Sequence, residues 1–221
     1  MKLFTDLSET KAEILTESVD GEKRLHIAGP FLMFDKPNRN GRIYPQKAMD
    51  AAVKKYTEDY ISKNRALGEF NHPSGRISVD PERAAILTTH LEKDGNYYYG
   101  KAKVLSTPLG KVLQALLNDG VRVGVSSRGA GSIAGTKGPH KMVGNDFMIT
   151  AAADTVHDPS VADAFVDHLM EEKEYIMING DFMEKTIYEE QMRIKKATSA
   201  KLMEAKIMAF QNFIEKISMP K

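Results

Sequence analysis

VRVGVSSRGAG, at residues 121–131, is the stretch of sequence from which the fold and chemistry of this chain can be worked out. Val121 to Ser126 is predicted as a strand that runs into the glycine-rich segment Arg128-Gly129-Ala130-Gly131. Glycine lets two backbones approach closely and leaves amides accessible. The stretch therefore offers a candidate nucleophile, Ser126 or Ser127, where a core strand ends.

Further strands are expected on both sides of this stretch, because apolar and polar side chains alternate there or form short apolar runs. Helices are indicated by apolar residues at a spacing of three and four positions. The expected strands are residues 24–33, 84–90, 97–104 and 147–156, and the expected helices are 45–60 and 107–117. We therefore expect an α+β protein in which helices surround a strand-rich core.

The two ends of the chain differ from the middle in composition. Residues 1–24 are polar and mixed in charge, which predicts a flexible leader or propeptide, or alternatively a first strand with its turn. Residues 25–168 hold the main domain. From 169 to 221 the sequence is rich in Glu, Lys, Met and Ala, with no proline before Pro220, and this predicts a long helical tail.

The composition excludes several classes of protein. Lysine and arginine number 31 against 30 for aspartate and glutamate, so no overall charge favours nucleic acid or an acidic membrane. The absence of cysteine rules out disulfides, a thiol nucleophile and thiolate metal ligands. No apolar run is long enough for a membrane span. We expect one soluble core in a reducing cytoplasm.

Serine, histidine and aspartate residues together point to a serine hydrolase. Besides its nucleophile, such an enzyme needs a base, a group to orient the base and donors for an oxyanion. His72 precedes Pro73, which places it in an extended conformation at a strand end. Asp154 stands alone in an apolar run and must be hydrogen-bonded if it is buried. Each residue also has a structural interpretation, since a histidine can be a simple hydrogen-bond partner, the serines part of a turn and Asp154 a loop cap.

Four strings of sequence resemble one family. They are NRNGRIYP (38–45), LGEFNHP (67–73), GVSSRG (124–129) and DTVHDPS (154–160). Over about residues 25–168 they resemble the prohead core protein proteases of T-even-like tailed phages, which are similar to the herpesvirus assemblins. The resemblance implies a serine protease domain with an assemblin-like β-barrel surrounded by helices, and a capsid-maturation function.

The resemblance also implies roles for individual residues. The family's histidine falls on His72. Its nucleophile follows a glycine and an apolar residue, which favours Ser126 and leaves Ser127 as the alternate, because adjacent serines on a strand point to opposite faces. Asp154 is the expected orienting acid, with His157 as the alternate, since assemblins use a second histidine.

Arginines are expected in two further roles. The resemblance implies that the backbone amides of Arg128 and Gly129 serve the oxyanion, with the arginine side chain helping through its charge or a held water. The family cuts after glutamate in Leu/Ile-X-Glu sequences, so a cation must select the glutamate. Arg76, Arg83, Arg122 and Arg128 lie in or near the motifs, and sequence does not distinguish them.

The same tripeptide pattern occurs in both ends of the chain, which suggests a proenzyme that cuts itself. The predicted self-cleavage residues are Glu17, Glu171 and Glu204. The tail is expected to be removable or to direct the chain to scaffold proteins. The implied substrates are phage scaffold or core proteins and the major capsid protein, inside the prohead in the host cytoplasm. A homodimer or higher oligomer is a further expectation, with no nucleic acid or membrane partner.

Two other functions compete with this one. The first is a non-enzymatic capsid or scaffold component of the prohead core, in which the histidine and serines are structural. The second is a metal-dependent hydrolase that uses Glu69, His72 and His90. The spacing from Glu69 to His72 does not match a zincin helix, so no metal and no other cofactor is expected.

Overall fold

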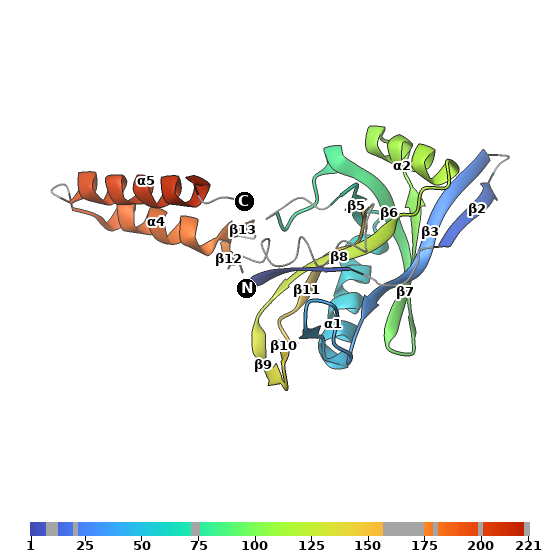
Figure 1. Cartoon of the computed structure of the whole chain (residues 1–221), viewed down its shortest axis with the longest axis horizontal. Helices are drawn as coiled ribbons and strands as arrows, with labels where there is room; N and C mark the ends of the chain where they lie inside the picture. The colour runs from blue at the N-terminus through green and yellow to red at the C-terminus, as the bar shows by residue number, and fades with distance from the viewer. Residues whose placement is uncertain are drawn as a thin grey trace. The chain divides into compact units, whose positions relative to one another are not determined.

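The computed structural model describes residues 1–7, 13–19, 22–71, 76–156, 175–178, 181–198 and 201–218. Contacts between residues divide the chain into two compact units, Lys2–Leu169 and Met170–Lys221, with Met1 grouped with the second. Both units contain helices as well as strands (Figure 1). The chain is therefore of the mixed α+β class that the sequence predicts.

A five-stranded antiparallel sheet forms one part of the first unit. Its strands, in order across the sheet, are β2 (Glu13–Val19), β3 (Glu22–Met33), β7 (Tyr97–Val104), β6 (Ala84–Asp94) and β5 (Leu67–Glu69). A hairpin at residues 94–96 joins β6 to β7. Its Gly95 has a φ of +56°, a conformation that glycine adopts without strain.

Two three-stranded sheets complete the first unit. One has the order β1 (Lys2–Leu7), β8 (Gly124–Gly131) and β11 (Met148–Val156), and the other has β4 (Arg42–Ile43), β10 (His140–Val143) and β9 (Ile133–Lys137). Phe70, just after β5, forms a single parallel bridge with Thr155 of β11. The five-stranded sheet and the β8 sheet therefore meet at this corner.

The expected β-barrel is not present. Across the corner the strands run from β2 through β5 and β11 to β1. Closure needs a ladder between the two end strands, and no ladder joins β1 to β2 in the part of the chain that the structure describes. The barrel prediction is corrected to open sheets that share a corner.

Helices α1 (Gln46–Tyr56) and α2 (Pro108–Asn118) confirm the two helices expected in the first unit. Helix α1 follows Pro45, packs against β11 and continues as the π-helical turn Thr57–Ile61 (Figure 1). Helix α2 packs against β6 and β7, and the Gly110 amide donates to its N-cap Thr107 at 3.1 Å. A short 3₁₀ turn, Pro81–Arg83, precedes β6.

The first strand belongs to the core, which agrees with the alternative that residues 1–24 begin with a strand. Strand β1 pairs with β8 over six residues, and β2 pairs with β3 over seven. Phe4 of β1 is buried, with its ring centroid 6.3 Å from that of Tyr44 and 6.4 Å from that of Phe147. Removal of this segment by cleavage stays a prediction.

The second unit is not one continuous helix. It contains the hairpin of β12 (Tyr175–Ile178) and β13 (Asp181–Glu184), then α4 (Lys185–Lys196) and α5 (Leu202–Ser218). The Lys201 amide donates to the Thr198 carbonyl at 2.9 Å, which forms a turn between the helices. The two helices contact each other, so the long-tail prediction is corrected to a helical hairpin that follows two short strands.

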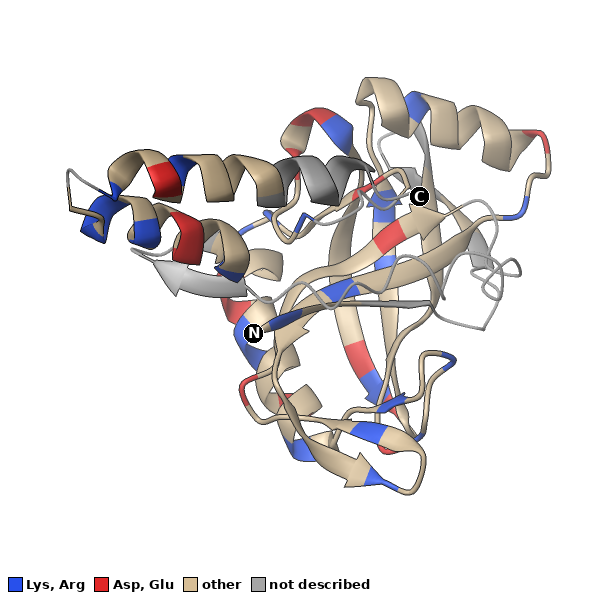
Figure 2. Cartoon of the chain, turned by 60° about the vertical axis from the view of Figure 1, so that its left-hand side comes forward, with Lys and Arg blue, Asp and Glu red and all other residues tan. Residues whose placement is uncertain are grey.

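Charged residues of both signs are interspersed along the helices and strands (Figure 2). This distribution agrees with the near balance of 31 basic and 30 acidic residues. Among the helices that the structure describes, none is both long and apolar enough to cross a membrane.

Candidate active site

Strands β8 and β11 bring Ser126 opposite Asp154. The two residues are directly paired across the antiparallel ladder, so their side chains lie on one face. Arg128 shares this face because it lies two positions from Ser126, whereas Ser127 lies on the opposite face. Between Ala151 and Asp154 the register of β11 shifts, and this bulge sets which side chains meet.

The Ser126 hydroxyl is buried and has no hydrogen-bond partner within the described residues. The residue is 1% exposed, and Ser127 is only partly buried. A buried hydroxyl without a partner is costly in a protein interior. Such groups are retained at functional sites more often than elsewhere.

Asp154 is fully buried, and its carboxylate is held from two directions. Oδ1 accepts the backbone N–H of Glu69 at 2.7 Å, and Oδ2 accepts Arg128 Nε at 2.5 Å. The prediction that a buried Asp154 must be hydrogen-bonded is confirmed. A carboxylate has about four acceptor positions, so this one can accept a histidine N–H as well.

The Arg128 side chain is fully buried, and every one of its N–H groups has an acceptor. Nη2 donates to Asp154 Oδ1 at 3.2 Å and to Glu69 Oε1 at 3.1 Å. Nη1 donates to the carbonyls of Arg76 at 3.2 Å and Ser78 at 3.3 Å. With Nε on Asp154, all five donors of the guanidinium are used. The side chain therefore has no donor left for direct binding of an oxyanion or a substrate glutamate, and its expected help through its charge stays a prediction.

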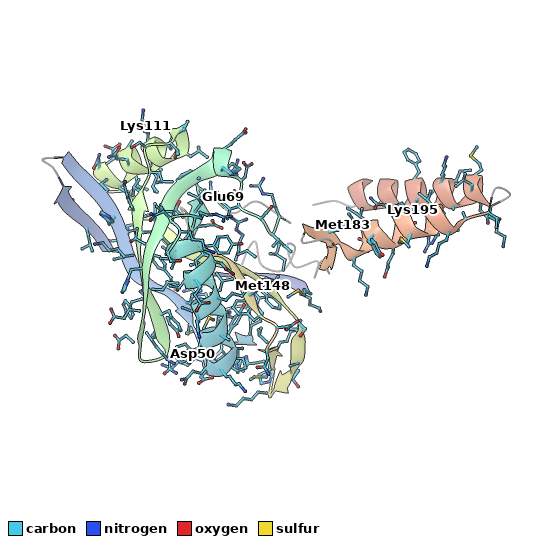
Figure 3. The ribbon with its side chains drawn as sticks, turned by 180° about the vertical axis from the view of Figure 1, so that it is seen from behind. Asp50, Glu69, Lys111, Met148, Met183 and Lys195 are labelled. Atoms are coloured by element: carbon cyan, nitrogen blue, oxygen red, sulfur yellow. The ribbon has the colours of Figure 1, made fainter. Side chains whose placement is uncertain are left out.

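Glu69 is the centre of an arginine cluster that the sequence reasoning missed. Figure 3 shows Glu69 inside the first unit, and its carboxylate accepts Arg76 Nη2 at 2.8 and 3.0 Å and the Asp80 amide at 2.8 Å. Arg83 Nε lies 3.3 Å from Glu69 Oε2. The available signal was the number of arginines near the motifs, because a buried glutamate requires cationic partners.

The chain that leads to His72 is attached to the strand that carries Asp154. Asn71 donates its amide to the Thr155 carbonyl at 2.8 Å, and it has a φ of +62°. Gly68 lets β5 approach β11 closely, because a Cβ at residue 68 would lie 1.9 Å from the Ala153 carbonyl oxygen. His72 and the alternate His157 lie outside the described residues.

Helix α1 packs behind the cluster through Tyr56. This side chain is buried and stacks on Tyr60, with ring centroids 5.1 Å apart. Burial, together with the negative charge of Asp154, raises the pKa of Tyr56 above its ordinary value. The phenol is therefore neutral at physiological pH.

Comparison with known proteins decides the family. A family model described as prohead core protein serine protease matches residues 8–174. The chain belongs to this family. It is 38% identical over 159 residues to the prohead core protein protease of Enterobacteria phage T4, covering 69% of this chain and 74% of the relative. The solved structure of the bacteriophage T4 capsid assembly protease matches with a TM-score of 0.67 and 35% identity, covering 72% of this chain and 98% of that one.

Membership of a prohead serine protease family confirms the predicted serine endopeptidase over the non-enzymatic component. The metal-hydrolase alternative gains nothing from the structure. Glu69 is occupied by arginines, and His90 is exposed beside Glu92. No group of three metal-binding side chains occurs within the residues that the structure describes.

The remaining predicted residues are Glu17, Glu171, Glu204 and Gly129. Glu17 is in β2, at the far edge of the five-stranded sheet, and Glu204 is in α5 of the second unit. Glu171 lies outside the described residues. Gly129 is in β8, where a Cβ would lie 2.5 Å from the Phe147 ring and 2.7 Å from the Met148 carbonyl oxygen.

Proposed function

We propose that Ser126 is the nucleophile of this prohead protease, with His72 as its base and Asp154 as the group that orients the base. The observation that carries the proposal is the attachment of Asn71 to Thr155 at 2.8 Å. This bond joins the residue before His72 to the residue after Asp154. Asp154 in turn faces Ser126 across the ladder. Three segments far apart in sequence thus converge on one place.

The arrangement suits acyl transfer through a serine ester. Ser126 Oγ bonds to the scissile carbonyl carbon as His72 takes the hydroxyl proton. The C–N bond then breaks, and His72 gives that proton to the leaving amine. Water, deprotonated by His72, hydrolyses the ester and restores the serine. Asp154 keeps the imidazole oriented and balances its charge.

Ser126 is favoured over Ser127 because of its face. Ser126 shares the face of Asp154 and Arg128, whereas Ser127 points away. His157 is the alternate for the orienting role. The amides of Arg128 and Gly129 are the proposed oxyanion donors, since the Arg128 side chain is fully engaged elsewhere.

The proposed substrates are the scaffold or core proteins and the major capsid protein of a phage, cut after glutamate inside the prohead in the host cytoplasm. The relative whose structure is known is described as a capsid assembly protease, which supports this choice. Arg122 is the proposed glutamate-selecting cation. It is exposed and lacks an ion pair among the described residues, whereas Arg76, Arg83 and Arg128 are bound to Glu69.

Self-cleavage after Glu17, Glu171 and Glu204 belongs to the same proposal, as do a homodimer and the domain limits 1–24, 25–168 and 169–221. Cleavage after Glu17 would separate β1 and most of β2 from the rest of the chain. The helical hairpin of α4 and α5 is proposed to bind scaffold proteins until it is removed.

Incubation of the full chain tests the proposal. Mass spectrometry of the products should show new ends after Glu17, Glu171 or Glu204 in the unsubstituted protein and in the matched control Ser127→Ala. The Ser126→Ala variant should stay at full length. Continued shortening of purified Ser126→Ala would disprove the assignment of the nucleophile.

A further inference from the structure

The edge of β8 beside Ser126 is occupied by the chain's own first strand. In the β1-β8-β11 sheet, β8 lies in the middle and β1 lies at the edge. Their antiparallel register runs from Lys2 opposite Gly131 to Leu7 opposite Ser126. An extended peptide segment therefore ends beside the proposed nucleophile.

This geometry is the one that an extended peptide adopts when it adds a strand to a sheet edge. Backbone hydrogen bonds supply affinity in such complexes, and pockets for alternate side chains supply specificity. Strand β1 has both features. Besides its ladder with β8, it inserts Phe4 among Tyr44 and Phe147, with the Arg42 guanidinium 5.0 Å from the Phe4 ring centroid.

The sequence that begins at the last residue of β1 also resembles a substrate of the proposed activity. Leu7 begins the tripeptide Leu7-Ser8-Glu9, which has the Leu-X-Glu pattern. The match to the family model begins at residue 8, so β1 lies outside the matched region. Strand β1 thus ends next to Ser126 at the residue that begins a substrate-like tripeptide.

Burial of Ser126 is consistent with an occupied site. A serine that attacks a peptide bond must be reached by the carbonyl carbon, yet Ser126 is 1% exposed. Its backbone is paired with Leu7 on one side and with Asp154 on the other. A substrate strand can pair with β8 next to Ser126 only in the place that β1 now holds.

We propose that the β1-facing edge of β8 is the docking site for an extended substrate peptide, and that β1 is an internal occupant which substrate must displace. The inference rests on the proposed role of Ser126. Beyond that role, it assigns the edge of β8 as the peptide-binding edge and β1 as a competitor of the substrate for that edge. The apolar site filled by Phe4 then accepts an apolar substrate side chain upstream of the cut.

A reversible lock tests the inference. The chain has no cysteine, so the double variant Leu3→Cys/Ala130→Cys can form only the one disulfide that ties β1 to β8. The substrate is a synthetic peptide of residues 11–20, which contains Leu15-Thr16-Glu17. Oxidation should slow its cleavage by about tenfold or more, and dithiothreitol should restore the rate. The control pair Ser18→Cys/Lys23→Cys, across β2 and β3, should show no such dependence.

Equal cleavage by the oxidised and reduced Leu3→Cys/Ala130→Cys protein would overturn the inference. Labelling of the reduced protein by a fluorophosphonate at Ser126 tests the proposed function separately. Absence of that label would sink the proposed function, whereas a label combined with lock-independent cleavage would sink only the docking inference.

Hydrogen exchange gives a second measurement that needs no disulfide. The Ser126→Ala chain is mixed with a saturating amount of the same peptide. Amides of residues 3–7 should exchange about tenfold faster than without peptide, because β1 leaves the ladder. Amides of β2, in the other sheet, should be unchanged. Unaltered exchange in β1 with bound peptide would show that β1 is a permanent strand.

Discussion

Arg128 has a buried side chain whose five N–H donors all have acceptors, and two of these hydrogen bonds hold the Asp154 carboxylate. A lysine has three donors on a flexible stem and cannot reproduce the planar fork. Because Nη1 also holds the carbonyls of Arg76 and Ser78, the guanidinium joins β8, β11 and the chain that follows residues 72–75. Its role is to hold the site in place.

Substitution Arg128→Lys is therefore expected to be far from conservative. Loss of buried hydrogen bonds should lower the free energy of unfolding by about 2–3 kcal/mol, measured by urea unfolding. The rate of fluorophosphonate labelling should fall by about 100-fold, since Asp154 is no longer held.

Arg83→Lys is the matched control. Arg83 belongs to the same cluster but is 43% exposed, and it contacts Glu69 and Phe70 rather than Asp154. Its substitution should lower the free energy of unfolding by less than about 1 kcal/mol and leave the rate of fluorophosphonate labelling within about threefold of that of the unsubstituted chain. Equal effects of the two substitutions would show that Arg128 has no special part in the site.

Gly68 is required because β5 approaches β11 closely. An alanine Cβ would lie 1.9 Å from the Ala153 carbonyl oxygen and 2.8 Å from Ile86 Cγ1. Gly68→Ala should lower the free energy of unfolding by about 1–3 kcal/mol and slow fluorophosphonate labelling. At Gly95 a Cβ would have open space, but the φ of +56° is strained for alanine. Gly95→Ala should therefore lower the free energy of unfolding by about 1–2 kcal/mol without changing the rate of labelling. Unimpaired labelling of Gly68→Ala would contradict the β5–β11 arrangement.

At the scale of elements, helix α1 is tied to β6 and β7 by one carboxylate. Asp50 accepts Lys93 Nζ at 2.9 Å and the Tyr98 hydroxyl at 2.7 Å. Burial alone would raise the pKa of Asp50, but hydrogen bonds from Tyr98, Lys93 and Gln46 outweigh it and lower the pKa below its ordinary value. Burial and the Asp50 contact raise the pKa of Tyr98.

The sign of this shift predicts a pH dependence. Because the folded-state pKa of Asp50 is depressed, its stabilisation is present above the unfolded-state pKa, about 3.9, and is lost as pH falls through the folded-state value. Asp50→Asn should therefore be less stable than the unsubstituted chain at pH 7, by no more than about 1 kcal/mol because the carboxylate is partly exposed. Urea unfolding at pH 7 and at about pH 3 measures the difference, which should shrink at the lower pH. A constant difference would show that the Asp50 contacts add nothing in the ionised form.

Most strands and both helices of the first unit follow from local sequence, but their arrangement does not. The alternation of apolar and polar side chains over residues 84–90 and 97–104 predicted β6 and β7. These strands pair with each other because only a short turn separates them. The pairing of β1 was not predicted because its partner, β8, lies more than 100 residues away. The open sheets and the helical hairpin depend on such distant contacts, which composition and periodicity do not record.

At the scale of the whole molecule, the site is assembled from segments around residues 69, 128 and 154. Sequence placed Ser126 and Asp154 on core strands, and the structure pairs them. Sequence did not predict that Glu69 and Arg128 meet, because that contact depends on the bulge in β11 and on the corner between the sheets. Glu69 was weighed only as a metal ligand, although it is an anion held by arginines.

The identity of the nucleophile is the central claim, and one labelling measurement tests it most directly. The full chain is treated with a fluorophosphonate, and the peptide that spans residues 124–128 is fragmented in a mass spectrometer. An adduct on Ser126 is expected, which persists in Ser127→Ala and disappears in Ser126→Ala. An adduct on Ser127, or labelling that survives in Ser126→Ala, would contradict it.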